Sequence, residues 1–470
     1  MSLLTLALLI NFLLIIGFIF FSNKDYRSSL KWVLVFFSFP LISFVFYFFL
    51  GRGIKINRKR YQNIVNKIDS IINEFRSFHS FKCNDDSLNR TLLITKELGG
   101  NFLTYYNDIY YFCNGSDYYS SLLNDIKNAK SSIHIEIYII HDDEFGKTLL
   151  DLLLTKANEG VKVKLVYDPN GNLLNKRGWL KKYHHLNIMF VKQFSSIDRI
   201  LNFNYRNHRK IVIIDGKVAY LGGFNFGDEY LSNNHKIDPF RDTQIKIIGE
   251  GVLELQRQFL IDFYYAYSKY NNSVNIELNQ TDFQCIKVNK IIPLQIISSS
   301  FMIRENLKRI KMNILLSAKK EIYIQTPYFV LDLTMMEQLK LLLLAKVKIS
   351  IMIPLKYDKR IPFCASLSYA RELYNLGADI YLYNGFIHAK TIIVDDKYLI
   401  VGSSNFDIRS FNLNLETDAF IYSRSEVNRY LNIYKTDIIY SLVYSPFIEQ
   451  KYFSSFKLGK RLYRIISSLI

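Results

Sequence analysis

The chain has 470 residues, a formal net charge of +18 and 49% hydrophobic residues. A chain of this length buries a large core and is long enough for more than one structural unit. Its four cysteines have no CxxC spacing, which argues against structural zinc and against a disulfide framework. The positive charge indicates an anionic partner, and on charge alone both nucleic acid and an anionic lipid surface qualify.

The N-terminus begins with two apolar runs. Residues 1–23 contain no charged side chain, and a second apolar run extends from Trp32 to Leu50. About twenty helical residues span the hydrocarbon core of a bilayer. Pro40 is expected to kink the second helix, which membrane helices tolerate. We therefore expect a two-helix transmembrane hairpin over residues 1–51, with helices at about 2–22 and 32–50.

Charge predicts the orientation of this hairpin. The link between the runs holds few charges, whereas a dense basic cluster follows the second run: Arg52, Lys55, Arg58, Lys59 and Arg60. The denser positive charge is expected to face the cytoplasm, together with the remainder of the chain. A cleaved signal peptide fits poorly, because no basic residue precedes the first run and no small-residue cleavage site ends it.

Residues 52–100 are expected to form a basic linker and an amphipathic helix. From Tyr61 to Phe78 the apolar residues recur at helical spacing and make one apolar face. Two interpretations remain open. The helix lies either on the membrane surface or against the domain that follows.

From about Phe102 strand patterns alternate with helix patterns, which predicts an α/β fold with a parallel or mixed sheet covered by helices. In the first half we expect a strand, a helix and a strand at 133–140, 145–158 and 161–167. In the second half we expect helices and strands in alternation at 306–318, 321–324, 335–344, 347–353, 365–376 and 379–383.

One short pattern occurs twice, as His208, Lys210 and Asp215 and again as His388, Lys390 and Asp395. Each copy runs into a matching tail, Gly222-Gly223-Phe224-Asn225 or Gly402-Ser403-Ser404-Asn405. The distance from the first strand of each half to its histidine is similar, which indicates an internal duplication. We expect two tandem α/β repeats at 101–285 and 286–447, related by a pseudo-twofold axis, and a basic amphipathic tail at 448–470.

The duplicated residues suit chemistry on a phosphodiester. Side chains alternate along a strand, so each His-x-Lys should present both side chains on one face. At a twofold axis, two histidines about 5–7 Å apart would flank one phosphate, one attacking phosphorus and the other protonating the leaving alkoxide. The lysines, with Asn225 and Asn405, would hold the non-bridging oxygens. This scheme requires neither a metal nor another cofactor.

Two further pairs of acids support the motif. Asp242-Thr243 aligns with Glu416-Thr417, and each acid is expected to hydrogen-bond the far nitrogen of the histidine in its own half. Asp215 and Asp395 have two interpretations, direct proton transfer or local support through a salt bridge in the turn after the strand. We favour local support.

Longer phrases around these residues resemble the phospholipase D superfamily, and within it the bacterial cardiolipin synthases. They are Arg206-Asn207-His208-Arg209-Lys210-Ile211, Arg241-Asp242-Thr243, Thr326-Pro327-Tyr328-Phe329 and Ser404-Asn405-Phe406-Asp407-Ile408-Arg409-Ser410-Phe411. The apolar N-terminus and the basic C-terminal tail also fit, so the resemblance covers essentially the whole chain. Phe240 departs from the family pattern, in which a tryptophan is expected before Arg-Asp-Thr.

The resemblance implies two tandem phospholipase D-like repeats and a reversible reaction between two phosphatidylglycerol molecules that gives cardiolipin and glycerol through a phosphohistidine. It implies His208 as the nucleophile and His388 as the acid and base, although the symmetry also allows the reverse. The implied partners are phosphatidylglycerol and anionic lipids of a bacterial cell membrane, with no nucleic acid. Alternatives are a phospholipase D that uses water, transfer to another lipid such as phosphatidylethanolamine, and a membrane-anchored nuclease.

Overall fold

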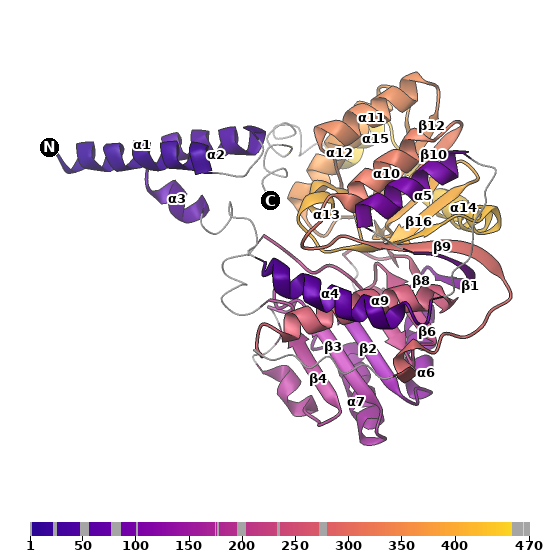
Figure 1. Cartoon of the computed structure of the whole chain (residues 1–470). Coiled ribbons are helices and arrows are strands. Elements are labelled where there is room, and N and C mark those ends of the chain that lie inside the picture. The colour runs from indigo at the N-terminus through magenta and orange to yellow at the C-terminus, as the bar shows by residue number, and fades with distance from the viewer. Residues whose placement is uncertain are drawn as a thin grey trace. The chain divides into compact units, whose positions relative to one another are not determined.

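The computed structural model describes residues 2–21, 26–47, 56–76, 86–99, 102–173, 175, 178–194, 204–232, 236–271, 280–453 and 464. The chain divides into two compact units (Figure 1). The N-terminal unit comprises residues 1–56 and 194–205, and the main body comprises residues 57–193 and 206–470.

The N-terminal unit contains helices α1 (Leu3–Phe21), α2 (Tyr26–Ser38) and α3 (Ile42–Phe46). The single helix predicted at 32–50 is wrong, because the chain turns between α2 and α3. Pro40 lacks the N–H that a continuing helix needs, and Leu41 adopts a left-handed φ of 62°. Among the described residues, no helix is long and apolar enough to cross a membrane, so the predicted transmembrane hairpin is not supported. Residues 1, 22–25 and 48–51 of that prediction lie outside the described ranges.

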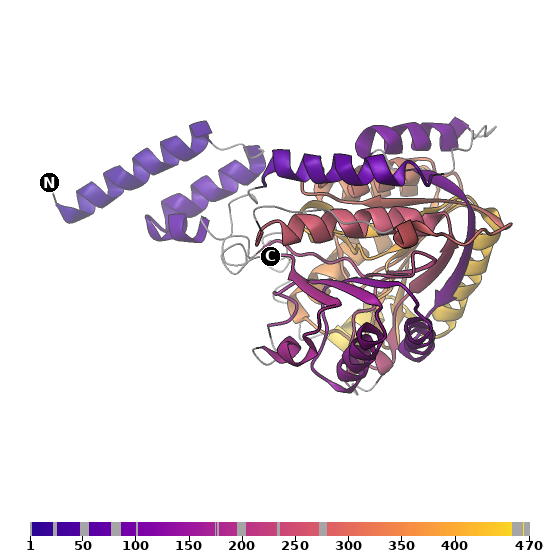
Figure 2. The ribbon, with the colours of Figure 1, turned by 60° about the horizontal axis from the view of Figure 1, so that its bottom comes forward.

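Helix α4 (Arg58–Ile72) is the first helix of the main body. Asn57 caps it by accepting the N–H of Arg60 at 3.0 Å. Its apolar face lies against α9 (Gly251–Tyr267), where the rings of Tyr61 and Tyr265 are 5.2 Å apart. Figure 2 shows the two helices side by side. These contacts agree with the interpretation of this segment as a helix packed on the following domain, and the membrane-surface interpretation stays a prediction. Residues 77 and 78 of the predicted segment lie outside the described residues. A further helix, α5 (Asp86–Gly99), contacts α10 (Asn306–Leu316).

The main body is built on one mixed sheet of 15 strands. The strands of the first half are β1 (Leu103–Phe112), β2 (Ser132–Ile137), β3 (Lys162–Tyr167), β4 (Ile188–Lys192), β5 (Ile211–Ile214), β6 (Val218–Gly222) and β8 (Gln244–Gly249). Those of the second half are β9 (Ile291–Ser298), β10 (Glu321–Gln325), β12 (Lys348–Pro354), β13 (Asp379–Tyr383), β15 (Thr391–Val394), β16 (Tyr398–Gly402), β18 (Thr417–Ile421) and β19 (Ser441–Val443).

The order of strands shows the duplication. Antiparallel pairing of β1 with β9 joins the two halves. Outward from that pair, the order β8-β6-β5-β2-β3-β4 in the first half matches β18-β16-β15-β10-β12-β13 in the second. The predicted two-repeat α/β architecture is therefore confirmed, whereas the boundaries at residues 101, 285 and 447 stay predictions.

Helices cover both faces of this sheet. They include α6 (Gly115–Lys127), α7 (Glu144–Asn158), α11 (Leu333–Leu344), α12 (Arg360–Tyr374) and α14 (Arg424–Ile439). Along β2, Ile133 and Ile135 pack in the core with α6 and α7, whereas His134 and Glu136 point to the opposite face. There His134 stacks on Phe259 of α9. In the second half, the ring of Tyr323 on β10 likewise lies 5.1 Å from that of Tyr434 on α14.

The C-terminal segment begins with α15 (Pro446–Phe453). Beyond it the structure describes only Arg464, which pairs with Glu372 at 2.7 Å. The basic tail predicted at 448–470 thus lies mostly outside the described residues.

Asp215 and Asp395 close two equivalent turns. The Asp215 carboxylate accepts the N–H of Lys130, Ser131 and Ser132, and that of Asp395 accepts three N–H groups at 319–321. Both residues have a left-handed φ, 55° and 51°. These aspartates thus tie a hairpin turn to the start of β2 or β10. The contacts are hydrogen bonds to backbone, not the salt bridges we expected.

We predict that Asp215→Ala destabilises the protein by about 1–3 kcal/mol, because several N–H groups at the edge of the core lose their acceptor. Asp215→Asn should cost less, since Asn keeps a carbonyl acceptor and tolerates a left-handed φ. The unfolding midpoint in denaturant measures both, with Asp395→Ala as the equivalent change in the second half. A midpoint that is unchanged in all three variants would rule out this support role.

Candidate active site

We had predicted that the two His-x-Lys segments lie within strands, and that is wrong. They lie just before β5 and β15. Each segment pairs with a segment of the other half. The N–H of His208 donates to the carbonyl of Leu415 at 2.9 Å, and the N–H of His388 donates to the carbonyl of Arg241 at 2.6 Å. The latter contact continues the short parallel pair of β7 (Phe240–Arg241) and β14 (Phe386–Ile387). The main chain thus brings both copies of the motif to the boundary between the halves.

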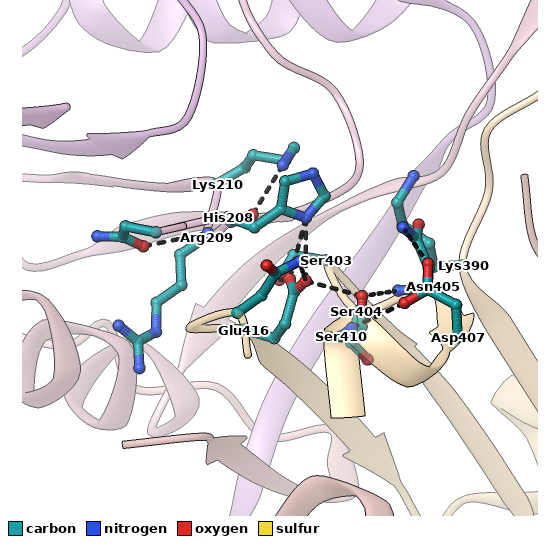
Figure 3. Close-up of polar contacts among 12 residues, drawn as sticks. His208, Arg209, Lys210, Lys390, Ser403, Ser404, Asn405, Asp407, Ser410 and Glu416 are labelled. Carbon is teal, nitrogen blue, oxygen red and sulfur yellow. Dashed lines mark hydrogen bonds and ion pairs between the residues drawn. The ribbon is translucent and has the colours of Figure 1, made fainter. Parts of the chain in front are cut away.

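The pairing across the halves determines which acid holds which histidine. The Nδ1 atom of His388 lies 2.5 Å from the carboxylate of Asp242. The Nδ1 atom of His208 lies 3.1 Å from the carboxylate of Glu416 (Figure 3). We had predicted that each acid would serve the histidine of its own half, and that is wrong. The acids are exchanged because residues 241 and 415 lie beside the histidine of the opposite half. In both pairs Nδ1 is occupied by the acid, so Nε2 is the nitrogen left for a substrate.

Burial and charge keep both imidazoles neutral. Burial lowers the pKa of His208 to about 4, although Glu416 acts in the opposite direction. Burial, followed by the charge of Lys390, also lowers the pKa of His388. Burial alone would raise the pKa of Glu416, but His208 and Lys210 bring it down to about 2. At neutral pH each site therefore holds an ionised acid and a neutral imidazole that can donate from Nδ1.

The two lysines are buried, and the charge of each acts on the histidine of the other motif. The ammonium group of Lys210 donates to the carbonyl of His208 at 2.7 Å, and Lys390 donates to the carbonyl of His388. Burial lowers the pKa of Lys210 to about 7 and that of Lys390 to about 8. The charge of Lys390 also affects His208, and the charge of Lys210 affects His388. These influences agree with the crossed main-chain and side-chain contacts, which bring both His-Lys pairs to the same boundary between the halves.

Asn225 and Asn405 lie at equivalent positions just after β6 and β16, and both are buried. The amide nitrogen of Asn225 donates to the hydroxyl of Tyr230 at 2.9 Å, and that of Asn405 donates to Asp407 at 3.1 Å. Within the described part of the chain, the carbonyl oxygen of each amide has no hydrogen-bond partner. Each amide thus keeps one N–H and one carbonyl for a ligand. Among the same residues, no group of three or more His, Cys, Asp or Glu side chains could hold a metal ion.

The two acids are held in different ways. Glu416 accepts hydrogen bonds from Ser403, Ser410 and Asn414 at 2.6, 3.0 and 3.0 Å (Figure 3). The residue equivalent to Ser403 is Gly223, and a Cβ atom there would lie 2.1 Å from the carboxylate of Asp242. The Gly-Gly tail therefore goes with an aspartate, for which Gly223 leaves room. The Gly-Ser tail goes with a glutamate, which Ser403 hydrogen-bonds. Sequence analysis recorded this difference between the tails but did not connect it with the acids.

Two buried arginines behind the site were not predicted. Arg209 points away from His208 and Lys210 in Figure 3, and it contacts Asp262 of α9 at 2.7 Å and Thr417 at 2.9 Å. In the second half Ala389 stands at the position of Arg209. There the guanidinium comes from Arg241, which contacts Asp437 of α14 and Thr243, both at 2.8 Å. Each histidine segment thus lies on a buried arginine–aspartate pair, although the two arginines come from different places in the chain.

Phe240, where the family pattern has tryptophan, lies beside the second histidine. Its ring centroid is 5.6 Å from that of His388 and 5.6 Å from that of Phe386. On the other side, the ring of Tyr138 lies 5.0 Å from that of His208. Aromatic rings therefore flank both imidazoles and help to bury them.

We predict that Gly223→Ser displaces Asp242 from His388, because its side chain would occupy the place of the carboxylate. Adding Asp242→Glu reproduces the Ser403–Glu416 arrangement and should restore the contact. In protein labelled with nitrogen-15 histidine, the Nδ1 resonance of His388 should shift in the single variant and return in the double variant. The His208 resonances serve as the internal control. An unchanged His388 resonance in Gly223→Ser would refute the prediction.

The sequence is similar to known proteins along its whole length. The family described as "Cardiolipin synthase, PLD-like domain" matches residues 122–257 and 312–438. A cardiolipin synthase of Oceanobacillus iheyensis is 36% identical over 100% of this chain and 98% of its own length. The major cardiolipin synthase ClsA of Bacillus subtilis is 35% identical over 93% of each chain.

Among solved structures, the phosphatidylserine synthase of Haemophilus influenzae Rd KW20 is similar with a TM-score of 0.60 and 15% identity. The match covers 81% of this chain and 100% of that one. This likeness supports the fold. The duplicated sheet, the paired motifs and the full-length similarity together lead to one conclusion: the chain belongs to the cardiolipin synthase family of phospholipase D-like proteins.

Proposed function

We propose that the protein is a phosphatidyltransferase that joins two phosphatidylglycerol molecules into cardiolipin and releases glycerol. One observation carries the proposal. Two neutral imidazoles, each oriented by an ionised acid of the opposite half, lie in one site with two buried lysines. The relatives that match along the whole chain bear the name cardiolipin synthase, which supports this choice among phosphodiester reactions.

In the first step, Nε2 of one imidazole attacks the phosphorus of the donor lipid. A nitrogen–phosphorus bond forms, the bond to the headgroup glycerol oxygen breaks, and that oxygen takes the Nε2 proton of the other imidazole, so that glycerol is released. The attacking ring must be neutral to offer a lone pair. The other ring must be an imidazolium at this step, a form that its acid and the bound phosphodiester anion both favour. The resemblance assigns the attack to His208 and the proton transfer to His388.

In the second step, a headgroup hydroxyl of the acceptor phosphatidylglycerol attacks the same phosphorus. Its proton passes to the imidazole that protonated the glycerol, and the nitrogen–phosphorus bond breaks. Two phosphatidylglycerol molecules thus give one cardiolipin and one glycerol, and the site returns to its starting state. Because the same bonds form and break in the opposite direction, the transfer is reversible.

Lys210, Lys390, Asn225 and Asn405 would stabilise the negative charge that develops on the non-bridging oxygens. A bound phosphodiester anion favours the charged form of each lysine, which opposes the effect of burial. Asp242 and Glu416 would fix the tautomer of the histidine that they contact and stabilise the imidazolium as it forms. Asp215 and Asp395 act at a distance, through the turns that they hold.

We further propose that the N-terminal unit attaches the enzyme to the membrane that holds its substrates. Many of its large apolar side chains are exposed, including Leu13, Phe20, Phe21, Phe37 and Ile42. Exposed apolar patches of this kind mark membrane or protein contact sites. The relatives of this family and the positive charge of the chain favour an anionic bacterial membrane, with the main body on its cytoplasmic side.

The first test uses purified protein in detergent–lipid micelles with labelled phosphatidylglycerol as the only substrate. We expect cardiolipin and glycerol from the wild type, detected by thin-layer chromatography and mass spectrometry. His208→Ala and His388→Ala should each lower the rate by a factor of about a thousand or more. His184→Ala, which changes an exposed histidine, is the matched control and should keep the wild-type rate.

Phosphatidic acid as the sole product would show that water is the acceptor and that the synthase proposal is wrong. Cardiolipin that forms only after phosphatidylethanolamine is added would identify a different acceptor. Equal rates for His184→Ala and His208→Ala would contradict the assignment of the site.

Membrane attachment predicts that the full chain floats with vesicles of phosphatidylglycerol in a density gradient. A chain that lacks residues 1–56 should float less, because it loses the exposed apolar side chains. Equal flotation of both chains at high salt would contradict attachment through the N-terminal unit, since salt weakens the charge attraction of the main body.

A further inference from the structure

The short helix η3 (Asp228–Leu231) lies beside the second motif and carries an acid that the proposed chemistry does not use. Tyr230 of η3 packs edge to face on Phe240 with ring centroids 5.0 Å apart, and the ring of Phe240 lies 5.6 Å from that of His388. The acid is Glu229, and 38% of its side chain is exposed. Glu229 is therefore near His388 and accessible to a ligand.

Contacts with the start of α7 hold η3 in place. The Asp228 carboxylate accepts two N–H groups of the first turn of α7, at 3.1 and 2.9 Å, and the N–H of Asp228 donates to Asp143 at 2.7 Å. A Cβ atom at Gly227 would lie 2.5 Å from the ring of His141, so the absence of a side chain there lets η3 lie close to that ring. The position of Glu229 is thus built into the fold.

Two hydrogen bonds orient the Glu229 carboxylate. The Nε2 atom of His141 donates to it at 3.3 Å, and the hydroxyl of Tyr230 donates to it as well. The same hydroxyl accepts from the amide nitrogen of Asn225 at 2.9 Å. A chain of hydrogen bonds thus connects Glu229 with an amide that we assign to the reacting phosphate. A carboxylate has about four lone-pair positions, so Glu229 can accept further hydrogen bonds.

The charge of Glu229 limits what it can bind. Burial alone would raise the pKa of its carboxyl, but hydrogen bonds from His141 and Tyr230 and the charge of His388 lower it. The ionised carboxylate accepts hydrogen bonds and donates none, and it repels phosphate oxygens. Its ligand near His388 is therefore a hydroxyl or a cation, and not the phosphodiester itself.

The equivalent position in the other half holds the opposite charge. Counted from the repeated asparagine, Glu229 corresponds to Arg409 of α13 (Ile408–Asn412), which lies near the acids Asp407 and Glu416. Because Glu416 holds His208, this arginine is on the nucleophile's side of the site. The two sides have different tasks, since the attacking nitrogen and the leaving oxygen lie roughly in line on opposite sides of phosphorus. The acid is on the side of the alcohol.

The alcohols that react beside His388 share one feature. Glycerol leaves from that side in the first step, and the headgroup of the acceptor lipid attacks from it in the second. In both, the carbon next to the reacting oxygen carries a further hydroxyl group. Water has no such group. A carboxylate beside the acid and base histidine is placed to accept a hydrogen bond from this second hydroxyl.

We propose that Glu229, oriented by His141 and Tyr230, binds the hydroxyl next to the reacting oxygen and thereby selects glycerol headgroups as leaving group and acceptor. The inference rests on the proposed synthase function, with His388 as the acid and base. Hydrogen bonds to a charged acceptor are strong, and a site built around one rejects an alcohol that lacks the hydroxyl. Glu229 is thus a specificity residue and takes no part in proton transfer.

The test is a competition between two alcohols for the same phosphohistidine. Protein in phosphatidylglycerol micelles receives equal amounts of isotope-labelled glycerol and trimethylene glycol, which is glycerol without its central hydroxyl. Mass spectrometry gives the ratio of the two lipid products at early times. We expect the wild type to favour glycerol roughly ten- to hundredfold, and Glu229→Ala to remove most of this preference. Glu337→Ala, which changes an exposed acid paired with Lys340 on α11, should keep the wild-type ratio.

Both alcohols compete on the same molecules, so the ratio is independent of the fraction of protein that is folded. Loss of the preference, with transfer to trimethylene glycol retained, would support the inference. Glu229→Gln keeps the size of the side chain and one acceptor oxygen, so it should give an intermediate ratio even where Glu229→Ala is inactive. An unchanged ratio, or loss of both products in both variants, would overturn the inference.

Two results with the wild type also decide. Equal use of the two alcohols would overturn the selection of glycerol. If ethanolamine, added as a third acceptor, is preferred over glycerol and Glu229→Ala abolishes that preference, the carboxylate binds an ammonium group and the inference is wrong. Wild-type protein that forms no cardiolipin and transfers to no alcohol would instead overturn the synthase function on which the inference rests.

Discussion

The hydrogen bonds from His388 to Asp242 and from His208 to Glu416 are the contacts on which the site depends. Both cross the boundary between the two repeats, so neither repeat can orient its own histidine. The antiparallel pairing of β1 with β9 makes this exchange possible, because it joins the halves into one sheet and sets the two motifs face to face. Symmetry, burial and the ionisation states of the site all follow from that arrangement.

Behind each histidine–acid pair lies a second, buried pair of charged residues. Arg209 and Asp262 lie behind one histidine segment, and Arg241 and Asp437 lie behind the other. Burial, then Asp262, raise the pKa of Glu136 to about 8, so this β2 acid is neutral near pH 7, like Gln325 at the equivalent position of β10. The two halves therefore reach the same balance of charge by different residues.

Much of the fold and most of the site residues could be predicted from the sequence, since the repeated motif and the alternation of strands and helices are local signals. The strands at β3, β10, β12 and β13 begin within about two residues of their predicted starts. The exchange of acids could not be predicted, because it depends on the pairing of segments about 150–200 residues apart, which no local pattern encodes. Arg241 was missed as the counterpart of Arg209 for the same reason. The prediction of the second N-terminal helix was wrong near Pro40. We expected this proline to kink the helix, but the helix ends there.

The crossed acids also affect the protein while it is being synthesised. Domains of a growing chain fold as units, the N-terminal one first. When the first repeat leaves the ribosome it contains His208 and Lys210, but Glu416 has not yet been made. Asp242 has already been made, but its partner His388 has not. A chain that ends early therefore carries His208 without the acid that orients it.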